Sequence, residues 1–278
     1  MNPAADSVFA QLSVSVIAGS EEHNIRDCLA SAAFAGEIIV VCSQRDDATM
    51  VIAREFTDKV LFRPFDGFAS QKAFALAQCT RDWVLSIDAD ERVSDELRED
   101  IRTVLLTSAA QDGYYIPRRN HFHGRWIRYG GWYPDLQLRL LRRERARVTT
   151  RLVHEGFEVN GSRGELRGHL LHYTLPRVRH MLKKNLDYAL FEAREKRNRR
   201  RITVLDFLLR PPLEFLKKYL FQRAFLDGWE GFIISVIHAA NKRQMLIYLW
   251  EMQYRGVDEG IPKESPPPGQ ESSGGAGA

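Results

Sequence analysis

The first ninety residues alternate short apolar runs with segments of helical pattern, and this alternation constrains the fold more than any other feature. Strands that are apolar on both faces and alternate with helices predict a mostly parallel sheet with helices on both sides. Ligands bind such sheets beyond the carboxyl ends of the strands, so the residues after each run are the first site candidates. The predicted strands are Leu12–Ile17, Glu37–Val41, Lys59–Phe62 and Trp83–Ile87, and the predicted helices between them are Ile25–Ala33, Ala48–Phe56 and Phe68–Ala77.

The composition is that of a globular protein with room for one α/β domain and a helical appendage. The chain has 278 residues, of which 44% are hydrophobic and 27% are charged. Its three cysteines, Cys28, Cys42 and Cys79, follow no metal-binding spacing and cannot all pair, so we expect reduced thiols in a cytoplasmic protein. We find no signal-peptide pattern at the start and no apolar run of spanning length.

An acidic cluster follows the fourth predicted strand in the sequence LSIDADER. Residues two apart in an extended chain project to the same side, which lets Asp88 and Asp90 face one pocket. Two close carboxylates repel each other unless a cation lies between them, and oxygen ligands suit Mg²⁺ or Mn²⁺. The alternative is a solvated turn whose acids interact with the dipole of the next helix, predicted at 94–106 with Ser94 as its cap.

Several segments together resemble family 2 glycosyltransferases with the GT-A fold, and in particular the lipopolysaccharide-core glucosyltransferase-like enzymes. The resemblance spans roughly residues 12–255 and implies a Rossmann-like, mostly parallel sheet flanked by helices. It also implies that Asp88 lies near the nucleoside and ribose of a nucleotide-sugar donor and that Asp90 is the metal ligand. The segments that carry it are LSVSVIAGSEEHNIRDCL, EIIVV, FDGFASQKAFALAQCTRDWVLSIDADERVSDELREDI, GGWYPDLQLRLLRR and LVHEGF.

Two glutamates and a lysine are further donor-site candidates. Glu21 and Glu22 follow the first strand, where a carboxylate can accept hydrogen bonds from a base or ribose; the alternative is that they are helix N-terminal acids. Lys72, beside Gln71 on the third predicted helix, stands where the family places a lysine near the donor phosphates. The alternative for Lys72 is a solvated position on that helix.

The loop after the second strand departs from the family pattern. Cys42 replaces the aspartate that the family uses for the nucleobase, and a thiol is a poor hydrogen-bond partner. Two turn glycines have become Gln44 and Ala48. The change is compatible with another nucleobase, with a rebuilt loop in which Asp46 or Asp47 substitutes, or with loss of the donor site. We expect Cys42 to be buried and inert.

By the same resemblance Asp135 is the catalytic base, and Trp126, Trp132 and Tyr133 are candidates for stacking on sugar rings. An inverting transfer needs a base to deprotonate the attacking hydroxyl. The alternative is that Asp135 forms a loop salt bridge with Arg139. His154 is a candidate third metal ligand, with His172 as a weaker rival; the alternative for a lone histidine is a structural hydrogen bond.

The carboxy-terminal part combines basic and apolar residues. A basic helix is predicted at 177–201, and apolar and aromatic residues crowd 207–252, with breaks at Pro211–Pro212 and at Asp227–Gly228. A basic face beside an apolar face is typical of a helix at an anionic membrane surface. A helical appendage packed on the catalytic domain is the alternative. No nucleic-acid motif accompanies the charge, so we expect no nucleic-acid partner.

These features predict three parts. Residues 1–175 form a GT-A catalytic domain, with a nucleotide-binding half at about 10–92 and an acceptor half at about 93–175. Residues 176–256 form the helical, membrane-associating region, and 257–278 form a disordered tail rich in Pro, Gly and Ser. The expected activity is metal-dependent, inverting transfer of a sugar, such as glucose from UDP-glucose, to a lipid-linked or lipopolysaccharide-core acceptor. The rivals are a non-catalytic membrane scaffold and a nucleotidyltransferase, although the acidic GSEEHN loop does not suit a triphosphate.

Overall fold

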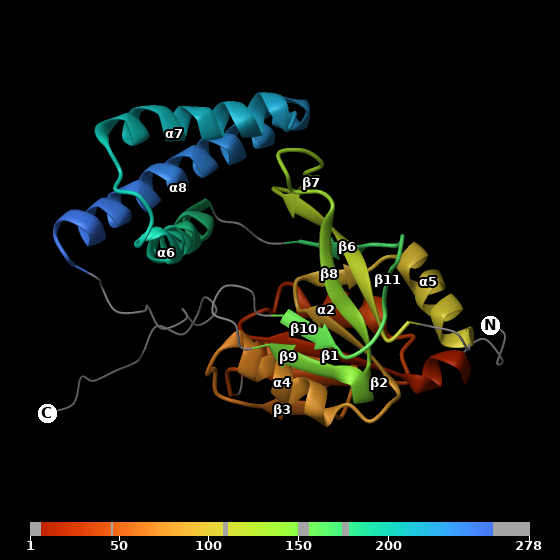
Figure 1. The fold of residues 1–278 in the computed structure, drawn as a ribbon. Helices are drawn as coiled ribbons and strands as arrows, with labels where there is room; N and C mark the ends of the chain where they lie inside the picture. Colours follow the sequence, from red (N-terminus) through yellow and green to blue (C-terminus); the bar gives the residue numbers. More distant parts are fainter. Residues whose placement is uncertain (1–6, 46, 108–110, 150–155, 174–177, 258–278) are drawn as a thin grey trace, which may run out of the picture. The chain divides into compact units, whose positions relative to one another are not determined.

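The computed structural model describes residues 7–45, 47–107, 111–149, 156–173 and 178–257 (Figure 1). Contacts between residues divide the chain into two compact units. The first contains the described residues up to 118 together with 136–172. The second contains 119–135 and the described residues from 173 onward. The predicted domain boundaries remain predictions, and the tail from 258 onward lies outside the described residues.

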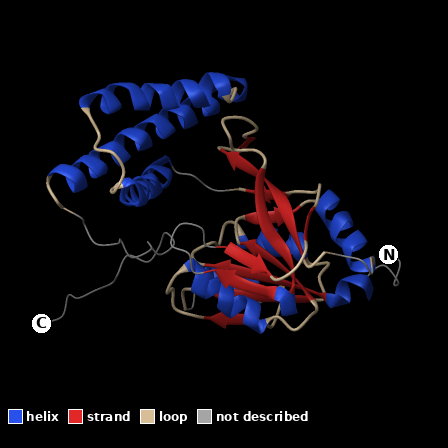
Figure 2. Ribbon diagram, viewed as in Figure 1, coloured by secondary structure: helices blue, strands red, loops and turns tan. Residues whose placement is uncertain are grey.

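Four parallel strands form the amino-terminal half of the sheet in the first unit, in the order β3-β2-β1-β4. They are β1 (Leu12–Ala18), β2 (Glu37–Cys42), β3 (Val60–Phe62) and β4 (Trp83–Asp88). The connecting helices are α2 (Ile25–Ala32), α3 (Ala48–Ala53) and α4 (Phe68–Gln78). The alternating strands and helices predicted from the sequence, and the α/β class, are confirmed (Figure 2).

Both faces of this sheet are buried, as parallel strands require. On β2, Val40 packs into the main core with Leu29 of α2, whereas Ile39 and Val41 pack on the other face with Ala75 of α4. Helix α5 (Asp95–Leu106) adds Leu97 and Ile101 to the main core. Its predicted cap is confirmed, because Ser94 Oγ accepts a hydrogen bond from the backbone N–H of Leu97 at 3.2 Å.

The sheet continues past β4 in the order β8-β6-β12-β5. These strands are β8 (Asp135–Arg142), β6 (Gly113–Phe122), β12 (Leu170–His172) and β5 (Glu91–Val93). Strand β8 lies antiparallel to β4 and buries Leu140 and Leu141. Smaller strands are β11 (Arg163–Glu165), which pairs with β6, and the separate pair β9 (Ala146–Thr149) and β10 (Gly156–Val159).

The second unit is mainly helical. Helices α6 (Val178–Lys196) and α7 (Val204–Leu216) both pack on the long helix α8 (Gly228–Tyr254). Short turns η3 (Lys217–Phe221) and η4 (Ala224–Asp227) join α7 to α8, and the short strand β7 (Arg125–Trp126) pairs with the end of β6. The predicted break at Asp227–Gly228 is confirmed, but Pro211 and Pro212 lie inside α7 rather than between helices. None of the helices in the described part of the chain has the length and apolar character that crossing a bilayer requires.

Candidate active site

Asp88, the last residue of β4, is held by two basic side chains in the first unit. Arg139 Nη2 of β8 lies 2.6 Å from its Oδ2, and Lys72 Nζ of α4 lies 3.3 Å from its Oδ1. Burial alone would raise the pKa of Asp88, but Arg139 and Lys72 hold that pKa well below the usual value. Burial also lowers the pKa of Lys72, while Asp88 opposes that shift. The predicted donor residues Lys72 and Asp88 are therefore in contact.

Glu91, the first residue of β5, is fully buried and fixes the turn after β4. Its Oε2 accepts a hydrogen bond from the backbone N–H of Asp88 at 2.9 Å. Its Oε1 lies 3.2 Å from both Arg118 Nη1 and Arg139 Nη2. Because a buried carboxylate must be paired, the two arginines and Glu91 form one charged cluster beneath the turn.

Asp90 has a different partner from Asp88. The chain turns at 89–90 instead of running on as a strand, so the expected extended Asp-x-Asp geometry was wrong. Strand β12 pairs with β5 so that His172 lies opposite Glu91, and this register brings His172 Nε2 to 3.1 Å from Asp90 Oδ2. The other histidine candidate, His154, lies outside the described residues.

Asp90 and His172 are the candidate holders of a divalent ion. Among the residues that the structure describes, no group of three or more His, Cys, Asp or Glu side chains is arranged to hold a metal. Asp90 supplies a carboxylate oxygen, the type of ligand that suits Mg²⁺ and Mn²⁺, and His172 supplies an imidazole nitrogen, a ligand typical of transition-metal ions. This pair fits an ion that takes its remaining ligands from water and substrate phosphates, which is the usual arrangement for Mg²⁺.

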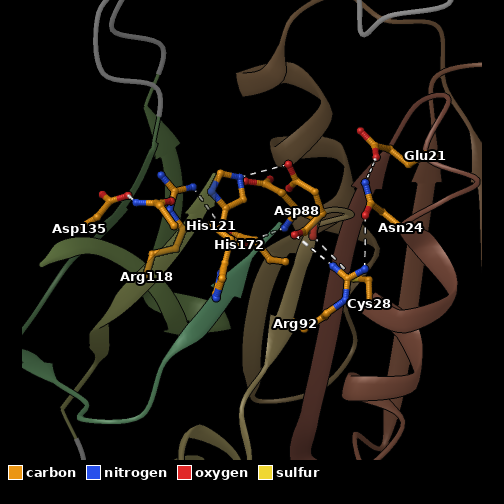
Figure 3. A network of polar contacts seen from close by, with 12 residues as sticks. Glu21, Asn24, Cys28, Asp88, Arg92, Arg118, His121, Asp135 and His172 are labelled. Atoms are coloured by element: carbon orange, nitrogen blue, oxygen red, sulfur yellow. Dashed lines mark hydrogen bonds and ion pairs between the residues drawn. The ribbon is translucent and has the colours of Figure 1, made fainter. Parts of the chain in front are cut away.

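Glu21 lies at the other side of the acidic turn and is linked to it through two side chains (Figure 3). Asn24 Nδ2 donates to Glu21 Oε2 at 2.9 Å, and Arg92 Nη2 donates to Asn24 Oδ1 at 3.3 Å. Arg92 Nη1 also lies 3.4 Å from the carbonyl oxygen of Asp90. Burial raises the pKa of Glu21 to about 7. The hydrogen bond from Asn24 lowers this pKa, whereas the negative charges of Asp90, Glu22 and Asp88 raise it further. Glu22 itself pairs at 3.7 Å with the exposed His23.

The altered loop after β2 is built around Asp47 rather than Cys42. Cys42 is fully buried, and burial together with the nearby charge of Asp47 raises its pKa to about 12, as expected of an inert thiol. Asp47 caps α3 by accepting from the Thr49 N–H, and its Oδ2 accepts from the Ser20 N–H at 3.0 Å. Asp47 thus joins the loops after β1 and β2, and its role with the nucleobase stays a prediction. Asp46 lies outside the described residues.

Asp135 belongs to the second unit, at the start of β8. Asn120 Nδ2 of β6 donates to its Oδ2 at 3.0 Å. The preceding loop is held by the buried Asp227, whose Oδ2 accepts the backbone N–H groups of Arg128 and Tyr129 at 3.0 and 2.8 Å. The role of Asp135 as the base stays a prediction.

The aromatic candidates near Asp135 also lie in the second unit. The Trp126 ring packs edge-on against Tyr133, with 5.4 Å between ring centroids. The guanidinium groups of Arg119 and Arg128 lie 4.6 and 4.3 Å from the centre of the Trp126 ring. Cations already contact this ring, and its stacking on a sugar stays a prediction.

Four residues of the cluster around Asp88 were not assigned to it from the sequence, and the first of them was considered only as a partner of Asp135: Arg139, Arg118, Arg92 and Asn24. One signal was present for Arg139, since it is the only charged residue in the run LQLRLL and is 4% exposed. A charged side chain in a run of strand residues that is otherwise buried requires a buried partner of opposite charge. Nothing comparable marks Arg118 or Arg92, whose partners lie far away in sequence.

Comparisons with known proteins identify the family of this chain. The family model "Glycosyl transferase family 2" matches residues 13–158, more than half of the chain. The chain is 32% identical over 241 residues to the lipopolysaccharide core biosynthesis glycosyltransferase LpsC of Rhizobium meliloti (strain 1021), covering 82% of this chain and 87% of LpsC. It is 27% identical to an uncharacterised glycosyltransferase of Rickettsia typhi, covering 88% of each chain.

Among solved structures, TarS residues 1–349 of S. aureus align with a TM-score of 0.43 and 15% identity, covering 89% of this chain and 92% of that one. The family match includes β1 from its second residue, the acidic turn after β4 and the whole of β8, so it covers the cluster around Asp88. With its mixed, mostly parallel sheet flanked by helices, the chain belongs to glycosyltransferase family 2 and has the GT-A type of α/β fold.

Proposed function

We propose that this protein is an inverting, metal-dependent hexosyltransferase that moves a sugar from a UDP-sugar, such as UDP-glucose, to a lipid-linked or lipopolysaccharide-core acceptor. The observation that carries the proposal is that both aspartates of the turn after β4, Asp88 and Asp90, have basic or imidazole side chains as partners. Asp88 is held by Lys72 and Arg139, and Asp90 faces His172, at the carboxyl ends of parallel strands. Ligands of open α/β sheets bind at this edge.

In this proposal, residues of the first unit bind the nucleotide-sugar donor. Lys72, beside Asp88, supplies positive charge for the donor diphosphate, and Asp88 accepts hydrogen bonds from the ribose. Glu21, held by Asn24, is a second acceptor for donor hydroxyl or base N–H groups. Asp90 with His172 would hold the Mg²⁺ or Mn²⁺ ion. When bound, that ion neutralises charge on the leaving diphosphate.

Asp135 is the proposed base. It accepts a proton from the acceptor hydroxyl as the hydroxyl oxygen attacks the anomeric carbon, and the nucleoside diphosphate leaves. Asn120 donates to one carboxylate oxygen of Asp135, which orients the carboxylate. Strand β8 carries Asp135 at its first position and Arg139 at its fifth, so one strand bears both the base and the residue that holds Asp88.

The proposed acceptor class rests on LpsC, which is named for lipopolysaccharide core biosynthesis. A lipid-linked acceptor made inside the cell implies work at the inner face of the cytoplasmic membrane. We therefore include in the proposal a peripheral location on that face, in contact with anionic lipid.

A transfer assay tests the proposal. Purified protein is incubated with Mn²⁺, labelled UDP-glucose and lipopolysaccharide truncated to its inner core, and label in the lipid fraction is counted. Label should transfer with wild-type protein and with Asp187→Asn, a control in the second unit, but not with Asp135→Asn. The Asp135→Asn variant should still bind UDP.

The outcomes separate the proposal from its rivals. Transfer by Asp135→Asn at the wild-type rate would remove Asp135 as the base. If wild-type protein transfers no label from any UDP-sugar and binds no UDP, the donor site has been lost, and the altered Cys42–Ala48 loop is the point of loss. The non-catalytic scaffold would then replace the transferase as the proposed function.

A further inference from the structure

Helix α7 leaves a continuous apolar surface uncovered within the second unit. It packs on α8 through one side, where Phe207 joins the core formed with α6. Its other side carries Leu205, Leu208, Leu209, Leu213 and Leu216, and Leu220 of η3 continues the same row. Leu208 is 65% exposed and the others are at least 40% exposed. These residues recur at the three- and four-residue spacing of one helix face. We call them the leucine stripe.

Three exposed aromatic residues follow the leucine stripe in the chain. Phe221 is 82% exposed and Trp229, in the first turn of α8, is 77% exposed, with the exposed Phe225 between them in η4. Soluble monomers rarely expose contiguous apolar surface on this scale without a partner. Trp beside aliphatic residues is typical of surfaces that lie at the boundary between water and lipid.

The charges around the stripe indicate what covers it. Exposed basic residues lie at both ends of α7, with Arg199 and Arg201 before it and Lys217 and Arg223 after it. Two acids of the same segment are used internally, and a third, Glu214 of α7, is partly buried. Asp206 pairs with Arg200 and Arg210, and Asp227 is buried against the loop that contains Arg128. An apolar surface with a basic border complements a membrane with anionic headgroups.

Two prolines limit how deep the stripe can lie. Pro211 and Pro212 have no backbone N–H, so the carbonyls of Phe207 and Leu208 cannot receive the usual helical hydrogen bond from them. In hydrocarbon such carbonyls would be costly, whereas water and headgroups can satisfy them. The stripe therefore suits the headgroup boundary rather than the hydrocarbon centre.

We infer that the leucine stripe, with Phe221, Phe225 and Trp229, docks this protein on an anionic lipid surface. This inference deepens the proposed function by naming the surface that binds lipid. It rests on the proposed function in one respect: a lipid-linked acceptor would explain why the protein docks on a membrane. The segment after the stripe also holds the loop before Asp135. Lys218 Nζ donates to the Gly130 carbonyl and the Gly130 N–H donates to the Gln222 carbonyl, each at 2.9 Å. Docking thus places the loop that precedes the proposed base beside the lipid that carries the acceptor.

Vesicle co-sedimentation of the full chain tests the inference. Wild-type protein should bind vesicles of phosphatidylglycerol and phosphatidylethanolamine, and bind vesicles of phosphatidylcholine alone much more weakly. Leu208→Ser with Leu213→Ser should lower partitioning by about tenfold or more, because two exposed apolar side chains that would enter the lipid are lost. Lys217→Gln with Arg223→Gln should weaken binding to the anionic vesicles and reduce its salt dependence.

The matched control is Val51→Ser with Leu106→Ser, which changes two exposed apolar residues of the first unit. It should bind vesicles as wild-type protein does. Thermal unfolding and UDP calorimetry on every variant show that the fold and the donor site persist. UDP binding without vesicle binding in the leucine variant supports the stripe as the docking surface.

Two other outcomes overturn the inference, and a third contradicts only the proposed function. A leucine variant that binds vesicles like wild-type protein would remove the stripe from lipid contact. A wild-type dimer in light scattering that the same variant dissociates, with no vesicle binding by either, would assign the stripe to a second copy of the chain. Vesicle binding by a wild-type protein that binds no UDP would leave docking intact and contradict only the proposed function.

Discussion

Arg139 Nη2 lies 2.6 Å from Asp88 Oδ2 and 3.2 Å from Glu91 Oε1, so one buried arginine joins the end of β4 to the start of β5. Glu91 is fully buried and Arg139 is 4% exposed. Removal of one partner of such a pair leaves a buried charge without compensation, and this costs more than the pair itself contributes. Arg139 thus positions the first aspartate of the acidic turn.

Arg139→Met should therefore lower the free energy of unfolding by roughly 3 kcal/mol or more. It should also weaken UDP binding, because Asp88 and the turn lose their anchor. Urea denaturation and calorimetry measure the two effects. Arg147→Met is the control, since Arg147 is 77% exposed in its pair with Glu158 and such pairs contribute about 1 kcal/mol or less. Equal stability losses in the two variants would contradict the account.

Asp227→Ala should separate catalysis from donor binding. Asp227 accepts two backbone hydrogen bonds from the loop that leads to Asp135, and a charged acceptor of this kind contributes about 1.5–3 kcal/mol per bond. Loss of these bonds loosens the loop, so kcat for transfer should fall while the affinity for UDP is unchanged. The matched control is Glu230→Ala on α8, whose partner Arg125 is half exposed. A fall in UDP affinity with unchanged kcat would place Asp227 on the donor side instead.

Glu37 should make stability depend on pH in the acid range. Burial alone would raise the pKa of Glu37, but hydrogen bonds from Lys59, Ser13 and Thr80 lower it to about 2 from 4.5. Because the folded pKa is depressed, the stabilisation is present above about pH 4.5 and is lost as the pH falls toward 2. Glu37→Gln should be destabilised by on the order of 2 kcal/mol at pH 7, and less at pH 3.

Urea denaturation at the two pH values measures this, with Glu55→Gln as the control. Glu55 pairs with Arg26 on the surface, where both side chains are about half exposed. Its loss should have little effect on stability at either pH. The same loss of stability in Glu37→Gln at pH 3 and pH 7 would show that the Glu37 carboxylate is not held ionised by its partners.

The sequence predicted the elements that local pattern decides. β1, β2 and β4 are short, mainly apolar runs, and Ser94 precedes an acidic first turn, so their structures follow from nearby residues. The resemblance placed Lys72 near the donor phosphates and Asp88 near the ribose. The structure brings the two side chains to 3.3 Å from each other, and their roles toward the donor stay predictions. Pro211 and Pro212 gave a wrong local signal, because packing on α8 keeps α7 helical through them.

The rest depends on contacts between residues far apart in sequence. Strand β8 gains its hydrogen bonds from β4, more than fifty residues earlier, so its own residues do not identify it fully. His172 reaches Asp90 only because β12 pairs with β5 in one register, and a shift by one residue would turn the ring to the other face. For this reason the sequence ranked His154 first and His172 as the weaker rival, and His154 lies outside the described residues.

Calorimetric titration with UDP, with and without Mn²⁺, tests the central claim most directly. Wild-type protein should bind UDP more tightly when Mn²⁺ is present. Asp90→Asn should lose the effect of Mn²⁺, and His172→Gln should reduce it. Asp95→Asn, an exposed acid on α5 close by in sequence, should behave like wild-type protein. UDP binding that is the same with and without Mn²⁺ in the wild type, or that Asp90→Asn leaves unchanged, would contradict a metal-assisted donor site at the Asp88–Asp90 turn.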